Sequence, residues 1–306
     1  MTRAPALPRF DRARRLSPLA LLQIALTALP ALALTAHLAR AAEPQAARVV
    51  AIGGSITEIV YALDQQHRLV ARDTTSSYPP AARDLPDVGY MRALSPEGLL
   101  SVRPDLVIAV EGAGPPAALE VLRAAQIPFV EVPEAFDGPG IGAKIRAVGQ
   151  ALGVSERAAA LAAEVEDRVA HATAQARARA APDPLRVMFV LSIQGGRILA
   201  AGSGTEAEAI IRMAGGENAL SGFAGYKPVA DEAISRAAPD VILVMDREGP
   251  TAITDAALFA LPALAVTPAA ATRRVVRMNG LHLLGFGPRT AEAVRALNRA
   301  LYDGGA

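Results

Sequence analysis

A tyrosine, with a glycine before it and an arginine two residues after it, is the part of this sequence best suited to ligand chemistry. Residues 88–92 lead into Ser95-Pro96-Glu97, which is typical of a helix start, so Tyr90 is expected on a loop. A phenolate oxygen is a hard, anionic ligand that suits ferric iron. Free tyrosine has a pKa near 10, so ionisation at neutral pH needs positive charge nearby, from a bound iron or Arg92. The alternative is a rim tyrosine whose ring packs on Pro86.

Other residues with catalytic or metal-binding potential do not form a recognisable second site. The sequence has no Cys, which excludes disulfides, thiolate metal sites, iron–sulfur clusters and cysteine nucleophiles. No nucleophile elbow, phosphate-binding loop or dinucleotide-binding glycine pattern is present. The His residues show no metal-binding spacing; they are His37, His67, His171 and His282. We therefore expect a protein that is not an enzyme.

The composition and net charge of the chain bear on which kinds of partner it could bind. The 306 residues include 31 Lys and Arg and 30 Asp and Glu, a net charge of +1. Nucleic-acid binding needs a concentrated basic face, so no nucleic-acid partner is expected. Aromatic residues make up 4% of the chain and hydrophobic residues 52%, so the core must be mainly aliphatic.

The first 41 residues have the three parts of a secretory signal. A basic start is followed by an uncharged stretch, residues 16–39, and then by Ala39-Arg40-Ala41, where a signal peptidase could cut. We predict a signal peptide over 1–41, cleaved near Ala41, and a mildly acidic mature chain in the periplasm that is not embedded in the membrane. An uncleaved anchor is the alternative; Pro18 and Pro30 disfavour it. The export route, general or twin-arginine, stays open.

Short apolar runs alternate with helical patterns over most of the remaining chain. This alternation predicts parallel sheets covered by helices. The expected strands are residues 48–52, 68–72, 105–110, 128–132, 185–191, 241–245 and 273–278.

One long helix is predicted to separate two such α/β units. Residues 155–181 contain neither Gly nor Pro, and Pro182-Asp183-Pro184 ends the segment. The expected fold is α/β, with two Rossmann-like lobes joined by one long backbone helix and a ligand cleft between the lobes. The expected domains are an N-terminal lobe (42–140), a helical connector (141–184) and a C-terminal lobe (185–306).

An internal repeat supports two related lobes. In each lobe a Glu near a helix start is followed seven residues later by a Pro-Asp turn and an apolar strand. Glu97 precedes Pro104-Asp105 in the first lobe, and Glu232 precedes Pro239-Asp240 in the second. By themselves, both could be first-turn acids that favour the helix dipole.

Several segments from residue 48 to residue 301 resemble the periplasmic haem-binding proteins of bacterial haem ABC importers. These are solute-binding proteins whose lobes are joined by a single helix. The similar segments are Ile52-Gly-Gly-Ser-Ile-Thr-Glu-Ile-Val60, Gly89-Tyr-Met-Arg-Ala-Leu-Ser-Pro-Glu97, Ala214-Gly-Gly-Glu-Asn-Ala219, Gly225-Tyr-Lys-Pro228 and Leu283-Leu-Gly-Phe-Gly-Pro-Arg289.

The resemblance implies a role for each candidate site residue. Tyr90 would be the axial ligand of the iron of ferric haem b, with Met91 in the same block and Arg92 near the phenolate or a propionate. Tyr226 and Lys227 would face the cleft from the second lobe, and Lys227 would pair with a propionate. Some members that hold two haems have a His where this chain has Gln194. Because Gln is a poor iron ligand, the resemblance does not extend to a second coordinated haem.

The resemblance also implies a partner. Glu97 and Glu232 would dock a monomeric carrier onto basic pockets of a dimeric inner-membrane ABC permease with its ATPase. The same fold could instead bind cobalamin or a ferric siderophore. An exported α/β hydrolase that uses His67 or His282 is the alternative from another class.

Overall fold

The computed structural model describes residues 46–247 and 252–303. They belong to a compact unit that begins at Ala46. The predicted signal peptide lies outside the described residues. Within the described part, no helix is long and apolar enough to cross a membrane.

The first lobe contains a parallel sheet with the strand order β2-β1-β5-β6. Every residue of β1 and β5 is buried, as expected for short apolar strands in the middle of a covered sheet. A small antiparallel hairpin, β3-β4, lies outside this sheet. The strands are β1 (Val49–Ile52), β2 (Leu69–Arg72), β3 (Gly89–Tyr90), β4 (Ala93–Leu94), β5 (Leu106–Val110) and β6 (Phe129–Val132). The helices are α2 (Gly54–Ala62), α3 (Pro96–Ser101) and α4 (Pro116–Ala124), with 3-10 turns at Gln66–Arg68 and Pro80–Asp84.

The second lobe contains a sheet in which β10-β8-β7-β11-β12 follow one another and β9 pairs with β7. Its centre is parallel, but β8 runs antiparallel to β7 and β10, a feature that sequence analysis did not predict. The strands are β7 (Arg186–Gln194), β8 (Arg197–Ala201), β9 (Glu217–Asn218), β10 (Tyr226–Val229), β11 (Val241–Asp246) and β12 (Val275–Asn279). The helices are α7 (Glu206–Met213), α8 (Asp231–Ala237), α9 (Asp255–Phe259), α10 (Pro262–Ala265), α11 (Pro268–Ala271), α12 (Gly280–Leu284) and α13 (Thr290–Tyr302).

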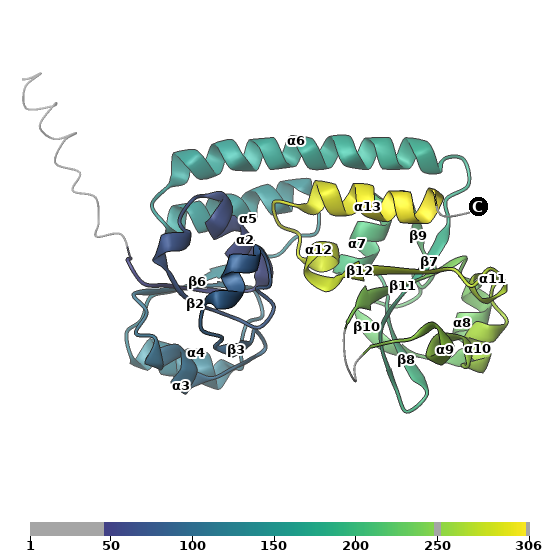
Figure 1. Cartoon of the computed structure of the whole chain (residues 1–306), viewed down its shortest axis with the longest axis horizontal. Helices are drawn as coiled ribbons and strands as arrows, with labels where there is room; N and C mark the ends of the chain where they lie inside the picture. The colour runs from purple at the N-terminus through teal and green to yellow at the C-terminus, as the bar shows by residue number, and fades with distance from the viewer. Residues whose placement is uncertain (1–45, 248–251, 304–306) are drawn as a thin grey trace, which may run out of the picture. The chain divides into compact units, whose positions relative to one another are not determined.

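A long straight helix, α6 (Ser155–Ala180), joins the two lobes and confirms the expected architecture (Figure 1). It packs along α5 (Gly138–Ala151) and along α13. The residues that α6 buries recur every three or four positions, so one narrow stripe faces both partners. They are Ala158, Ala162, Val165, Val169, Ala172, Ala176 and Ala180.

Small residues let α5 and α6 approach closely. A Cβ added at Gly149 would overlap the Cβ of Ala158, so only glycine fits there without movement of the helices. One apolar cluster continues from the first sheet through α5, α6 and α13 into the second sheet. The lobes are therefore packed on a shared core as well as joined by the chain.

Candidate functional site

A cavity of about 420 Å³ is lined by residues of both lobes. The first lobe contributes the turn after β1, the loop after β2 and the β3-β4 hairpin, and the second contributes β10, the end of β11 and α12. The lining residues are Gly53, Gly54, Ser55, Thr74, Thr75, Ser77, Tyr90, Met91, Arg92, Val110, Glu134, Leu191, Glu206, Tyr226, Met245, Arg247, Gly280, Leu281, Leu284 and Gly285. This volume lies within the usual range for small-molecule pockets.

The structure places Tyr90 in the wall of this cavity, as the last residue of β3 before the turn of the hairpin, rather than on an irregular loop. Its side chain is 47% exposed, and no hydrogen bond to it is found among the described residues. The preceding Gly89 has φ 102° and donates its N–H to Asp87 Oδ1 at 2.9 Å, while its carbonyl accepts from Thr74 N at 3.0 Å. The hairpin is thus held to the lobe by its backbone, and the phenol oxygen is left available to a ligand.

Met91 and Arg92 line the cavity beside Tyr90. Met91 is partly buried and packs on the core, which anchors the turn of the hairpin. Arg92 is exposed, and its positive charge acts against the rise in the pKa of Tyr226 that burial causes. A positive charge therefore stands next to Tyr90 and within electrostatic range of the second lobe.

Tyr226 faces the cavity from β10 but is held very differently from Tyr90. Its hydroxyl donates to Glu206 Oε2 at 2.9 Å, and its ring meets Phe189 edge-on, with centroids 6.3 Å apart. Burial, with the neighbouring Glu206 carboxylate, raises the pKa of Tyr226 far above its ordinary value near 10. Tyr226 is consequently a neutral hydrogen-bond donor.

Two of the predicted site residues do not line this cavity. Successive side chains of a strand point to opposite faces, so Lys227, next to Tyr226, lies on the other side of the sheet and lines a different cavity. Gln194 is exposed at the end of β7, where Gly195 and Gly196 turn the chain into β8. The structure therefore brings together Tyr90, Met91, Arg92 and Tyr226, and it separates Lys227 and Gln194 from them.

Asp73, which sequence analysis did not select, organises the floor of the cavity. It is fully buried and accepts hydrogen bonds from Gly53 N at 3.0 Å, Thr75 Oγ1 at 2.7 Å and Ser76 Oγ at 2.7 Å. It thereby fixes both the turn after β1 and the loop after β2. The run of polar residues that follows β2 in the sequence is the signal that could have pointed to Asp73.

A buried lysine links the cavity wall to the second lobe. The Nζ of Lys144 donates to Ser55 Oγ at 3.3 Å, to the carbonyl of Phe286 at 3.2 Å and to the carboxylate of Glu134. The lysine side chain is fully buried, whereas Glu134 lines the cavity. Phe286 also packs against Phe136, with ring centroids 5.2 Å apart. These contacts join α5 of the first lobe to the loop after α12.

A second charged contact between the lobes lies nearby. Arg289 pairs with both carboxylate oxygens of Glu58, with Nε 3.0 Å from Oε2, and its guanidinium stacks 3.5 Å from the centre of the Tyr78 ring. Burial raises the pKa of Glu58, although Arg289 opposes this shift. Burial and the Arg289 charge together lower the pKa of His282, which contacts Arg289.

The two acids of the internal repeat occupy equivalent places in their lobes. Glu97 lies in the first turn of α3, where Ser95 caps the helix by accepting from Gly98 N. Glu232 lies in the first turn of α8. Both side chains are exposed and neither forms an ion pair among the described residues. A partner molecule can therefore reach both.

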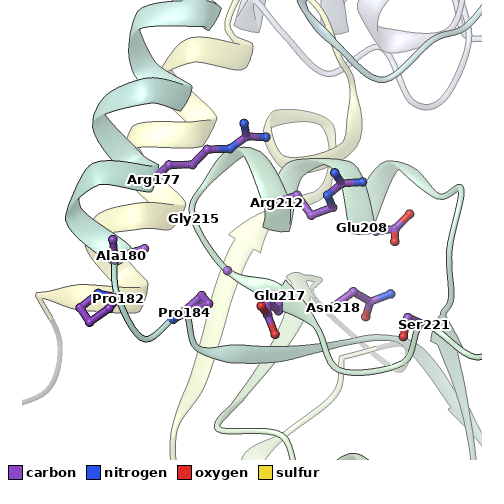
Figure 2. A pocket seen from close by; sticks show the side chains of 12 residues that line it. Arg177, Ala180, Pro182, Pro184, Glu208, Arg212, Gly215, Glu217, Asn218 and Ser221 are labelled. Carbon is purple, nitrogen blue, oxygen red and sulfur yellow. The ribbon is translucent and has the colours of Figure 1, made fainter.

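A larger hollow of about 600 Å³ lies elsewhere, between the C-terminal end of α6 and α7. Figure 2 shows Arg177 and Arg212 reaching over it, with Glu208 and Glu217 also on its walls. None of the residues predicted from the sequence lines it. No group of three or more His, Asp or Glu side chains within the described ranges could hold a metal ion.

The sequence profile of the family described as periplasmic binding protein matches residues 49–280, which include both lobes and α6. The chain belongs to this periplasmic binding protein family. It is a family of binding proteins rather than enzymes, and its members are periplasmic, in agreement with the two-lobed fold and the cavity.

Solved structures of periplasmic binding proteins resemble the chain over most of its length. The periplasmic heme-binding protein BhuT, in complex with two hemes, is 45% identical with a TM-score of 0.78 and covers 84% of this chain and 98% of its own. The apo form of the periplasmic heme-binding protein RhuT from Roseiflexus sp. RS-1 is 39% identical with a TM-score of 0.79, and it has the same coverage.

A curated relative gives a shorter match. The vitamin B12-binding protein of Yersinia pestis (strain Pestoides F) is 36% identical over 84 residues, which are 28% of this chain and 30% of that protein. The chain therefore matches less than a third of the length of this relative.

Proposed function

We propose that this periplasmic binding protein captures ferric haem in the cavity between its lobes and delivers it to an inner-membrane ABC permease. The observation that carries the proposal is the position of Tyr90, a half-exposed phenol with no competing partner in the described chain, on the wall of that cavity. The binding of haem by the similar proteins BhuT and RhuT supports the same ligand.

A porphyrin explains how one tyrosine can suffice for iron. The cavity offers no cluster of protein ligands for a bare ion in the described residues, but haem supplies four nitrogen ligands itself. Tyr90 would then provide one axial oxygen. Bound ferric iron would itself stabilise the anionic form of this oxygen ligand, and Arg92 lines the same cavity. Ferric iron suits this anionic oxygen better than ferrous iron does.

The rest of the cavity wall offers contacts for both parts of haem, the apolar porphyrin faces and the acidic propionates. Apolar side chains can contact the porphyrin faces; they are Met91, Val110, Leu191, Met245, Leu281 and Leu284. Arg92 and Arg247 also line the cavity and can pair with propionates. Arg247 takes the role that sequence analysis gave to Lys227, because Lys227 lies on the other face of its sheet.

Delivery would use Glu97 and Glu232. Two exposed acids in equivalent helices of two lobes fit two basic pockets on a two-fold symmetric permease. The carrier would act as a monomer, after a signal peptide over residues 1–41 has been removed, and the permease ATPase would drive uptake.

Hemin titration of Tyr90→Phe tests the iron ligand, and Tyr226→Phe is the matched control. We expect the wild-type protein to give a phenolate-to-iron absorption band and Tyr90→Phe to lose it, with affinity lowered at least ten-fold. Tyr226→Phe should keep the band, because Tyr226 is a neutral donor to Glu206. An unchanged spectrum and affinity in Tyr90→Phe would rule out this ligand.

Cobalamin is the second candidate, favoured by the partial match to a vitamin B12-binding protein. The cavity residues support it less well, because an available phenol oxygen and two arginines suit a ferric, doubly acidic ligand better. A competition titration of bound hemin with cyanocobalamin decides between them. Displacement of hemin at equal concentration would favour cobalamin.

A further inference from the structure

A second groove of the C-terminal lobe, outside the haem site, carries only positive charge. It encloses about 510 Å³, and the titratable residues that line it are Arg186, Lys227 and Arg236. The rest of its lining is mostly apolar or small and includes Leu220, Phe223, Pro228, Val229 and Ala233. We call this surface the basic groove.

The three cations of the basic groove have no anionic partner within the described chain. Lys227 Nζ lies 6.0 Å from the centre of the Phe223 ring, and Arg186 and Arg236 are exposed. Two acids lie four residues from Arg236 in sequence, Glu232 and Asp240, and neither forms an ion pair with it in the described chain. Asp240 is engaged through its Oδ2 by the backbone N–H of Arg186, at 2.8 Å. Unpaired cations in a groove lined mostly by apolar residues suit a ligand that is both anionic and amphipathic.

The position of the basic groove points to a membrane. One wall is formed by α8, through Ala233, Arg236 and Ala237, and the same helix carries Glu232 in its first turn. If Glu232 docks on a permease, the groove lies about one helical turn away from that contact, close to the bilayer that holds the permease. This step rests on the proposed docking of the carrier.

We propose that the basic groove binds the head group of an anionic phospholipid when the carrier docks. The phosphate would sit among the three cations, and the glycerol and first acyl carbons would contact Phe223 and the rest of the apolar lining. An acidic protein segment fits less well, because its charges would use the three cations and leave the apolar lining of the groove unexplained. The mature chain has a small excess of acids, so attraction to an anionic surface must come from this local patch.

Vesicle flotation tests the proposal without any permease. Protein purified after export is mixed at low salt with vesicles of phosphatidylcholine containing about one third phosphatidylglycerol, and with pure phosphatidylcholine vesicles. The test variant is Arg186→Gln, Lys227→Gln and Arg236→Gln together. The control variant removes the same charge from exposed arginines elsewhere: Arg103→Gln, Arg123→Gln and Arg299→Gln.

We expect wild-type protein to bind only the anionic vesicles. Each basic-groove cation removed should lower the partition coefficient about five-fold, and the triple variant about 100-fold. The partition coefficient of the control triple variant should fall less than ten-fold, and hemin binding should be unchanged in both variants.

Equal losses of vesicle binding in the two triple variants, or no binding of wild type to anionic vesicles, would overturn the proposal. Binding to a permease in neutral-lipid discs that the test triple abolishes would instead assign the groove to an acidic protein segment. A failure of haem binding in wild type would count against the proposed function and not against the groove.

Discussion

Removal of Arg289 should destabilise the protein strongly, and by an amount that depends on pH. Arg289 neutralises Glu58, whose side chain is only 5% exposed, and Arg289→Gln leaves that carboxylate buried without its partner. Breaking a buried pair in this way costs about 3–5 kcal/mol at neutral pH.

Protonation of Glu58 sets an upper limit on that cost. A buried carboxylate can become neutral by taking up a proton. Protonation costs about 1.36 kcal/mol for each pH unit above the ordinary pKa of the group, near 4.5. The limit is therefore about 4 kcal/mol at pH 7.5 and about 1.4 kcal/mol at pH 5.5. Since Arg289 is itself one-fifth exposed, we expect about 3 kcal/mol at pH 7.5.

The sign of the pH dependence follows from the pKa of Glu58. Burial raises the folded-state pKa above the unfolded value, so ionised Glu58 opposes folding, and its contribution worsens as pH rises from the unfolded pKa through the folded pKa. Loss of Arg289 raises the folded pKa further. The difference in stability between wild type and Arg289→Gln must therefore widen from pH 5.5 to pH 7.5.

Thermal unfolding followed by circular dichroism at the two pH values measures this effect. At pH 7.5 we expect Arg289→Gln to lower Tm by about 6–10 °C, and the addition of Glu58→Gln to restore most of the loss. Arg168→Gln is the control, because Arg168 pairs with Glu292 between side chains that are 36% and 52% exposed, and it should cost less than about 1 kcal/mol. A loss in Arg289→Gln that is the same at both pH values would refute this reasoning.

Two further predictions concern helix packing and docking. Gly149→Ala should lower the free energy of unfolding, measured in urea, by about 1–2 kcal/mol, because the added Cβ would overlap Ala158. The control Gly222→Ala has no atom within 4 Å of the added Cβ and should change it by less than about 0.5 kcal/mol. Equal effects of the two substitutions would show that close packing at Gly149 does not matter. Glu97→Gln with Glu232→Gln should lower affinity for the cognate permease at least ten-fold, measured with permease in lipid discs, while hemin titration stays unchanged. Undiminished permease binding would remove these acids from the proposed interface.

The fold was predictable because its signals are local. Short apolar runs specified the buried strands, and a stretch without Gly or Pro specified α6, which ends at Ala180 before Pro182. The antiparallel direction of β8 was not predictable in the same way, because an apolar run does not show whether the strand beside it is parallel or antiparallel. The turn at Gly195 and Gly196, between two such runs, was the only local sign of an antiparallel hairpin.

The residues that line the cavity were predicted in part. Tyr90 lines the cavity, and it was selected from the sequence because its residue type is rare in this chain and chemically specific. Lys227 was grouped with Tyr226 as a neighbour in sequence, but both lie on a strand, where neighbours face opposite sides. Arg247 was missed, although it follows the carboxyl end of β11, where ligands commonly bind to parallel sheets. A period of two applied to residues 226–229 separates Lys227 from Tyr226 on the sequence alone.

The contacts between the lobes also bear on how a ligand would be released. The lobes share α6, one continuous apolar cluster, the Arg289–Glu58 pair and the hydrogen bond from Lys144 to Phe286. Wide opening would separate both charged contacts and expose part of the shared apolar cluster. Exposure of apolar surface to water is unfavourable, so thermal fluctuations alone would populate an open state only rarely. We infer that lobe motion is small in the free protein. Release would then depend on binding energy from a partner that contacts both lobes at once. One exposed acid on each lobe provides such a pair of contact points.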